Sequence, residues 1–233
     1  MLTHPVDSSY TLVEVADLEG GPLPAPVRPH EAALRAVLAW TREYLCRPHP
    51  RLGRPGNVCP YAQAALDRAS LYLAVQPGRD HPPADIERRL LVYRDWFLRL
   101  SAAAAHPHLT TIVTVFPELL PEDVPSVIDA TQARLKPGYV ARGLMLGEFH
   151  DGPPAKPGLW NDGFRPLRSP LPLLAIRHMV PTDAMFLCDD PDHLREYLRR
   201  FGGQVPASLR AVARRAAQRF GVPLTGVGGA DGR

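Results

Sequence analysis

The sequence predicts an α/β (α+β) fold, in which helices cover a mixed β-sheet within a single domain. Short segments rich in β-branched and apolar residues alternate with segments whose apolar residues recur every three or four positions. These two patterns are typical of strands and of amphipathic helices. With 233 residues, the chain is long for one domain and short for two, which favours one compact domain.

The expected elements follow one another in chain order. A helix begins at Glu31, carries Val37 and Tyr44 on one apolar stripe, and ends near Cys46. A second, short helix begins at Pro60, because proline suits a first helical turn. The later elements are a strand at 70–76, a helix across 86–100, a strand at 109–116, a helix across 127–135 that stops at Lys136-Pro137-Gly138, strands at 142–149, 172–180 and 184–187, and helices near 191–201 and 206–220.

Three segments divide the chain. Residues 1–29 contain Gly and Pro in GGPLPAP and are expected to form an extended, partly mobile N-terminal lead-in. Residues 30–222 are expected to form the single α/β domain. Residues 223–233, which include Gly228-Gly229, are expected to be a frayed C-terminal tail.

The charge distribution excludes a dedicated nucleic-acid arm. The net charge is +3, and of the 27 basic residues only Lys136 and Lys156 are lysines, so arginine is spread along the chain. A nucleic-acid arm would show a local basic block with aromatic residues between the charges. The 27 prolines fall mostly between periodic segments, where they stiffen loops.

The termini and the cysteines indicate a cytoplasmic protein. The N-terminus has no basic start followed by an apolar run, and no stretch reaches the roughly 18 apolar residues of a membrane span. The three cysteines, Cys46, Cys59 and Cys188, cannot all pair and match no zinc pattern. We therefore expect free thiols in a reducing compartment, with Cys46 and Cys188 structural.

The segment NVCPYAQAAL, residues 57–66, is the predicted centre of the chemistry. Cys59 precedes a proline that is expected to open a helix. Unpaired backbone N–H groups and the macrodipole at a helix start favour thiolate over thiol. Three roles for Cys59 stay open from this segment alone: a packed small hydrophobic residue, a metal ligand or a nucleophile.

A resemblance bears on that choice. NVCPYAQAALDRASLYLAV resembles the Cys-Pro helix of haem-thiolate peroxygenases, and the order of elements from Leu52 to Leu187 is similar to the YqcI/YcgG-like family. That family includes the haem enzyme of D-cycloserine biosynthesis. The resemblance implies a haem-thiolate monooxygenase or peroxygenase that binds haem b, with Cys59 as the iron ligand. It also implies a small, nitrogen-containing, amino-acid-derived substrate in specialised metabolism, although the loop from His150 to Asp162 departs from the family.

Basic residues elsewhere suit that cofactor. The turn FRPLRSP carries Arg165, Arg168 and Ser169, which could meet the haem propionates, because arginine forks match carboxylates. A solvated surface turn is the alternative. Arg177 and His178 interrupt a strand that is apolar on both faces, so we expect Arg177 to need an anion and His178 to serve proton delivery or substrate positioning. An internal carboxylate could equally satisfy either residue, and Glu148 and His150 share a face that could join such a network.

Several alternatives stay open at this stage. Cys59 and His178 could act as nucleophile and base of a hydrolase or transferase, or the chain could be a non-catalytic binding domain. His150 or His178, rather than Cys59, could ligate the iron. The expected partner is a small-molecule substrate, without nucleic acid or membrane; a homodimer, a redox partner and the choice between oxygen and peroxide are left open.

Overall fold

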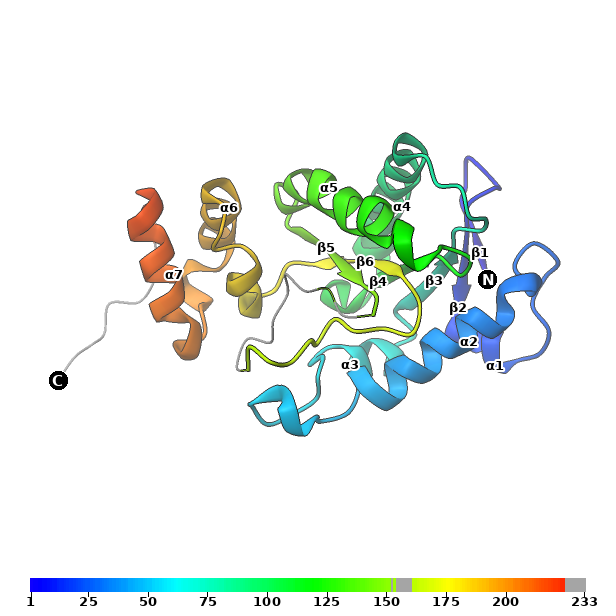
Figure 1. Ribbon diagram of the computed structural model, residues 1–233, viewed down its shortest axis with the longest axis horizontal. Helices are drawn as coiled ribbons and strands as arrows, with labels where there is room; N and C mark the ends of the chain where they lie inside the picture. Colours follow the sequence, from blue (N-terminus) through cyan, green and yellow to red (C-terminus); the bar gives the residue numbers. More distant parts are fainter. Residues whose placement is uncertain (152, 154–160, 225–233) are drawn as a thin grey trace. The chain divides into compact units, whose positions relative to one another are not determined.

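The computed structural model describes residues 1–151, 153 and 161–224. The chain divides into two compact units (Figure 1). The first contains Met1–Arg134 and Leu146–Arg177, and the second contains Leu135–Met145 and His178–Arg233. The mixed sheet with its helices, as expected from the sequence, is confirmed.

One sheet of six strands organises the described chain. Its order is β1 (Leu2–Thr3), β2 (Thr11–Glu14), β3 (Leu71–Val75), β4 (Thr111–Val115), β6 (Leu173–His178) and β5 (Leu144–Phe149). The β3–β4 pair is parallel, whereas β1–β2, β2–β3 and β4–β6 are antiparallel. The Met179 amide bonds the Gly143 carbonyl, so the end of β6 lies beside the start of β5. The carboxyl ends of β3, β4 and β5 therefore lie at the same edge of the sheet.

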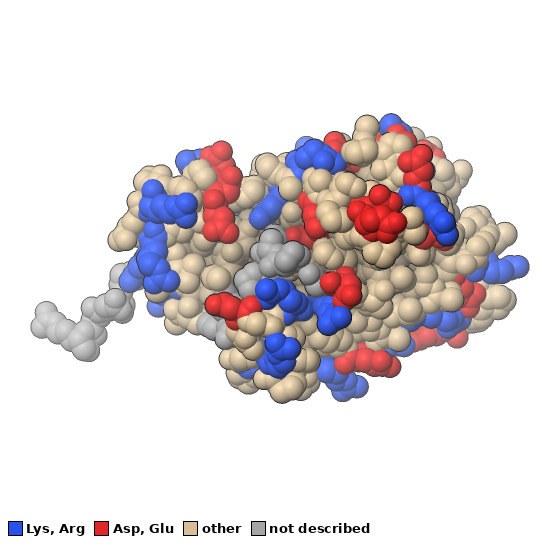
Figure 2. Space-filling model, in the orientation of Figure 1, with Lys and Arg blue, Asp and Glu red and all other residues tan. Residues whose placement is uncertain are grey.

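The surface carries charges of both signs. On the face shown in Figure 2, acidic and basic side chains are interspersed. Within the described part of the chain, no helix has both the length and the apolar character needed to cross a membrane.

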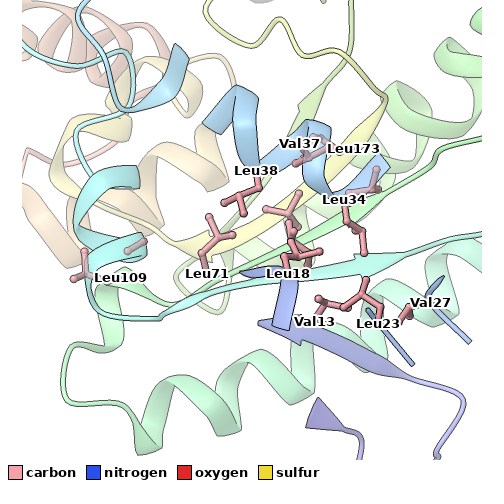
Figure 3. Close-up of a cluster of buried hydrophobic side chains, with 14 residues drawn as sticks. Val13, Leu18, Leu23, Val27, Leu34, Val37, Leu38, Leu71, Leu109 and Leu173 are labelled. Atoms are coloured by element: carbon pink, nitrogen blue, oxygen red, sulfur yellow. The ribbon is translucent and has the colours of Figure 1, made fainter. Parts of the chain in front are cut away.

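The core of the first unit lies between the sheet and three N-terminal helices. These are α1 (Val15–Glu19), α2 (Glu31–Trp40), which runs into a π-turn at Thr41–Leu45, and α3 (Ala62–Asp67). Their apolar side chains pack on β3, β4 and β6, as Figure 3 shows for Leu18, Leu34, Val37, Leu38, Leu71 and Leu173. Every one of these side chains is at most 5% exposed. Of the stripe expected from Glu31 onward, Val37 is buried, whereas Tyr44 is half-buried.

Further helices complete the chain. Helix α4 (Pro83–Ala103) buries the apolar stripe expected across 86–100, and α5 spans Ala130–Val140. Helices α6 (Pro191–Phe201) and α7 (Ala207–Phe220) confirm the two expected terminal helices, and Asp190 caps α6 by accepting the amides of Asp192 and His193. Short 3₁₀ or π turns lie at Arg28–His30, Pro50–Leu52, Pro107–Leu109, Pro121–Asp123, Pro125–Asp129, Pro181–Phe186 and Gly202–Gln204.

The expectation of a mobile lead-in at 1–29 is wrong. Strands β1 and β2 extend the sheet, and Leu12 and Leu18 are fully buried. The Met1 ammonium lies 3.1 Å from a carboxylate oxygen of Glu14 and 2.5 Å from one of Asp17. Of the expected tail at 223–233, residues 225–233 lie outside the described residues.

Two local expectations are also wrong. Helix α5 continues through Pro137 to Val140, because only one amide is lost at proline, the Ala141 amide still bonds the Pro137 carbonyl, and Tyr139 and Val140 are buried. Residues 184–187 form part of a 3₁₀ helix rather than a strand. There the buried Asp183 carboxylate accepts the Val180 amide at 2.8 Å, which favours a helical turn.

Candidate functional site

Cys59 lies in a turn before α3, not at its first residue. The helix begins at Ala62 with Tyr61 as its N-cap, so the predicted start at Pro60 is two residues early. The Cys59 amide bonds the Leu45 carbonyl at 2.9 Å, and the Val58 amide bonds the Arg47 carbonyl at 2.8 Å. These bonds hold the segment against the end of the π-turn at Thr41–Leu45 and the turn that follows it. The helix-dipole argument for a thiolate at Cys59 therefore does not apply.

Burial separates the three cysteines. Cys46 and Cys188 are buried, whereas Cys59 is half-buried, and all three are free thiols. Burial raises the pKa of Cys188 to about 11 and also raises the pKa of Cys46, to which the neighbouring Cys59 and Asp67 contribute. The thiols of Cys46 and Cys188 thus stay neutral at pH 7. Cys59, which is half-buried, carries the accessible sulfur.

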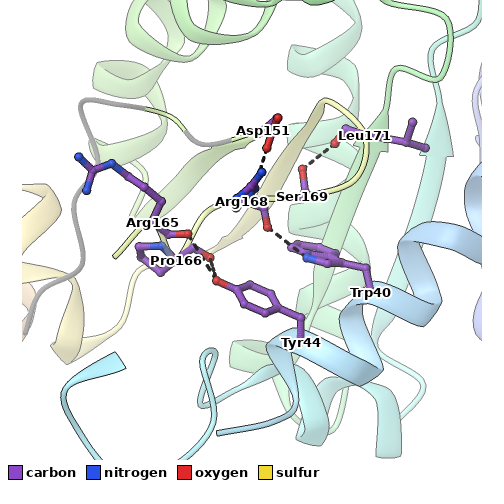
Figure 4. A network of polar contacts seen from close by, with 8 residues as sticks. All are labelled: Trp40, Tyr44, Asp151, Arg165, Pro166, Arg168, Ser169 and Leu171. Atoms are coloured by element: carbon purple, nitrogen blue, oxygen red, sulfur yellow. Dashed lines mark hydrogen bonds and ion pairs between the residues drawn. The ribbon is translucent and has the colours of Figure 1, made fainter. Parts of the chain in front are cut away.

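The turn at residues 164–170 is fastened to the end of α2. The Trp40 indole donates to the Arg168 carbonyl at 3.1 Å, and the Tyr44 hydroxyl donates to the Pro166 carbonyl at 3.2 Å (Figure 4). Burial raises the pKa of Tyr44 to about 12, so its hydroxyl keeps the proton that it donates. The His49 ring stacks on Phe164 with centroids 4.6 Å apart. Two segments singled out from the sequence, Cys59 and this turn, are therefore each hydrogen-bonded to residues at the end of α2 or in the π-turn that follows it.

The two arginines of the turn, Arg165 and Arg168, differ in the groups to which their side chains are bonded. Arg165 donates to the carbonyls of Asp162 and Phe164, at 2.6 and 3.1 Å, and so holds the shape of its own loop. Arg168 lies 2.6 Å from Asp151, and the two side chains are 67% and 79% exposed. Such an exposed ion pair is weak and exchangeable. Ser169 is buried and donates its hydroxyl to the Leu171 carbonyl at 2.6 Å.

Arg177 and His178 lie at the far end of β6. Arg177 pairs with Thr111 at the start of β4, whereas Leu173, next to the turn, pairs with Val115 at its end. Four residues of strand separate these ends by about 13 Å. Both side chains are half-buried, so the expectation of a fully dry strand end is wrong. Arg177 is not brought beside Arg165, Arg168 and Ser169, and His178 belongs to the second unit.

His150 lies beside the turn. Its carbonyl accepts the Ser169 amide at 2.8 Å, and His150 and Arg168 form a parallel bridge. Its Nε2 lies 3.0 Å from Asp129 Oδ1. His150, which was expected to share a network with Glu148, therefore pairs with Asp129. Asp129 was missed because it is 21 residues from His150; an acidic residue inside the apolar run SVIDA was the available signal.

The described residues fit haem b in part. They offer an accessible thiol, a single ligand of the kind that haem iron takes, and an exchangeable arginine on the same helix end. Arg177 does not fit as a second propionate partner of the same site, because it lies at the other end of β6. No cluster of three or more potential metal ligands occurs among the described side chains, although a haem held by one sulfur needs none.

The chain belongs to a protein family defined by a domain of unknown function, DUF6875, whose model matches residues 34–212. That match spans the helix end at Trp40 and Tyr44, Cys59, the turn and His178. No curated protein and no solved structure matches the chain.

Proposed function

We propose that the protein is a haem-thiolate oxidative enzyme of the monooxygenase or peroxygenase type. It would bind haem b through Cys59 and oxidise a small, nitrogen-containing, amino-acid-derived molecule in specialised metabolism. One observation supports this: the Leu45 carbonyl accepts the amide of Cys59, and its neighbour Tyr44 bonds the Pro166 carbonyl. Two consecutive residues, Tyr44 and Leu45, thus hold the arginine turn (residues 164–170) and the proposed ligand Cys59.

Each residue has a definite task in this proposal. Cys59 supplies the axial sulfur, while buried Cys46 and Cys188 stay neutral and do not compete. Arg168 exchanges Asp151 for a propionate, because an exposed pair loses little when it opens. Arg165 and Ser169 keep the turn in shape through their carbonyl bonds. When bound, thiolate-ligated haem would supply the oxidising chemistry.

We also propose roles for two residues that lie away from Cys59 and the arginine turn. His178 keeps its proposed role in proton delivery or substrate positioning, and Arg177 its proposed role in binding an anion, which from its position would be a group of the substrate. We further propose a cytoplasmic location, because all three thiols are free. Thiol labelling of intact cells before and after lysis tests that location, since a reducing compartment would keep all three reactive after denaturation.

The test is the absorption spectrum of protein expressed with ample iron and haem precursor. Reduced protein under carbon monoxide should show the strongly red-shifted Soret band of thiolate ligation, and Cys59→Ser should abolish it. Cys46→Ser and Cys188→Ser are matched controls that should keep the band. A spectrum that survives in Cys59→Ser would refute the proposal.

The same experiment separates the alternatives. A colourless protein that is rapidly alkylated at Cys59 would indicate a cysteine nucleophile, whereas a colourless protein with an unreactive Cys59 would indicate a binding domain. A band that depends on His150 or His178 would make histidine the ligand.

A further inference from the structure

Asp129 and His150 form a carboxylate–imidazole pair at the carboxyl edge of the sheet. His150 directly follows β5, and Asp129 ends the π-turn that leads into α5. The imidazole Nε2 lies 3.0 Å from Asp129 Oδ1, with the two side chains 11% and 38% exposed. A carboxylate at this distance orients the ring and stabilises the imidazolium that forms when the ring accepts a proton.

The second ring nitrogen of His150, Nδ1, decides what the pair can do chemically. Among the described residues, no hydrogen bond is made to Nδ1 of His150, and this atom is not among their buried unpartnered nitrogens. With Asp129 holding the proton on Nε2, Nδ1 presents a lone pair. An imidazole held in this tautomer is suited to take a proton from a bound molecule.

Arg168 is the nearest cation of the turn. Because residues paired across a bridge point to the same side of a sheet, the His150–Arg168 bridge sets the Cβ atoms of these two residues side by side. Within the described part of the chain, the guanidinium of Arg168 pairs with the exposed carboxylate of Asp151. A carboxylate on a small molecule can replace Asp151 and gain a second hydrogen bond from the guanidinium fork.

We propose that Asp129, His150 and Arg168 form an acid–base site for a small carboxylic acid that carries an O–H or N–H group within a few bonds of its carboxylate. Arg168 binds the carboxylate, and Nδ1 of His150 takes the proton from the O–H or N–H. The electron pair stays on the ligand's heteroatom, and the same proton returns to it before the ligand leaves, so no other bond is made or broken. Asp129 is a positioning residue. This inference goes beyond the proposed function and shares with it only Arg168, which would hold either a propionate or the small acid.

L-lactate is the probe, because it joins a carboxylate to a hydroxyl; propionate lacks the hydroxyl and lactamide lacks the carboxylate. Calorimetry on the full chain should give millimolar affinity for lactate and an affinity about tenfold weaker in His150→Gln or Arg168→Gln. The affinity for propionate should be the same in His150→Gln as in the parent protein. The affinity for lactamide should likewise be unchanged in Arg168→Gln. Exposed His108→Gln and Arg88→Gln are the matched controls.

The Asp129→Asn variant has its own readout. The ¹⁵N shifts of the His150 ring should show Nε2–H in the parent protein and a mixture of tautomers in this variant, with lactate binding weakened. Unchanged shifts would remove Asp129 from the site.

The inference and the haem proposal can fail separately. Lactate that does not bind, or binds equally to His150→Gln and the parent protein, overturns the acid–base site even if the Cys59-dependent Soret band is present. Lactate that binds through both residues in a protein without haem supports the acid–base site and refutes the haem proposal alone. Loss of the Soret band in His150→Gln would make His150 a ligand and overturn its role as base.

Discussion

The indole Nε1 of Trp40 donates a hydrogen bond to the backbone carbonyl of Arg168, across 128 residues of sequence. Trp40 also meets Phe149, at the end of β5, edge to face with centroids 5.8 Å apart. One side chain therefore connects the end of α2, the end of β5 and the arginine turn. Trp40 therefore holds the backbone of Arg168 in place.

We expect Trp40→Phe to loosen the turn while keeping the aromatic contact with Phe149. Loss of one hydrogen bond should lower the free energy of unfolding by about 1 kcal/mol. Amide hydrogen exchange should rise in residues 165–169 and stay unchanged in β3, which serves as the internal control. Equal exchange in the turn of both proteins would contradict this role for Trp40.

Removing residues 1–14 should destabilise the protein strongly. The deletion takes away β1 and β2, leaves the edge of β3 unpaired, and loses the burial of Leu12 and Val13, which are 0% and 1% exposed. Each buried side chain contributes about 2 kcal/mol, and an open strand edge favours aggregation. Urea midpoints and light scattering measure both effects.

Val6→Ser is the control for that deletion, because Val6 is 88% exposed. It should leave the urea midpoint unchanged. A truncated chain as stable as the full chain would mean that the N-terminal strands contribute nothing to the sheet.

Replacing His81 with leucine should stabilise the protein. His81 is 6% exposed, neither ring nitrogen has a hydrogen-bond partner in the described residues, and its ring meets Phe116 edge to face. Removing two unsatisfied nitrogens should raise the free energy of unfolding by about 1 kcal/mol at pH 7.5.

Lowering the pH should enlarge the difference in free energy of unfolding between His81→Leu and the parent protein. Burial lowers the pKa of His81 below 6.5, so the unfolded chain takes up a proton before the folded one. The neutral ring's contribution to stability is present above pH 6.5 and is lost as the pH falls through the folded-state pKa. The urea midpoint should fall less between pH 7.5 and pH 5.5 in His81→Leu than in the parent protein. His108→Leu, at an exposed position, should retain the parent divergence.

Raising the pH should destabilise the protein through ionisation of the Cys188 thiol. Burial raises its pKa from 9.0 to about 11, so the thiol's contribution to stability is complete below pH 9 and is lost as the pH rises toward 11. Cys188→Ser keeps the volume and removes the ionisation. Its urea midpoint should fall less than that of the parent protein between pH 8 and 10.5. Parallel falls would show that Cys188 does not titrate differently on folding.

Strong local periodicity made most elements predictable. Helices α6 and α7 and strands β3 and β4 lie within a few residues of their expected bounds, because each has a complete apolar pattern of its own. Strands β1 and β2 were missed, since two and four residues carry too little pattern. Strand β2 is ordered by pairing with β3, where Val13 is opposite Leu73, and β1 is ordered by pairing with β2. Tertiary burial likewise carries α5 past Pro137.

The candidate site was predictable only where its parts are local. Cys59 and the turn with Arg165 and Arg168 stand out in short stretches of sequence. The bonds of both to Tyr44 and Leu45, and the pairing of His150 with Asp129, join residues that are far apart in the sequence. No local pattern contains that information.

Strand β6 is made after β5 but lies between β5 and β4. During synthesis on the ribosome, β3 and β4 can pair as soon as both have emerged, yet β5 cannot join them until residues 173–178 have been made. The edge of β4 at Thr111–Val115 therefore stays open while some sixty further residues are added. Insertion of β6 must form bonds on two sides at once, a non-local step of the kind that is slow in folding. The nascent chain is thus most exposed to misfolding and to chaperones just before the residues of the arginine turn and β6 appear.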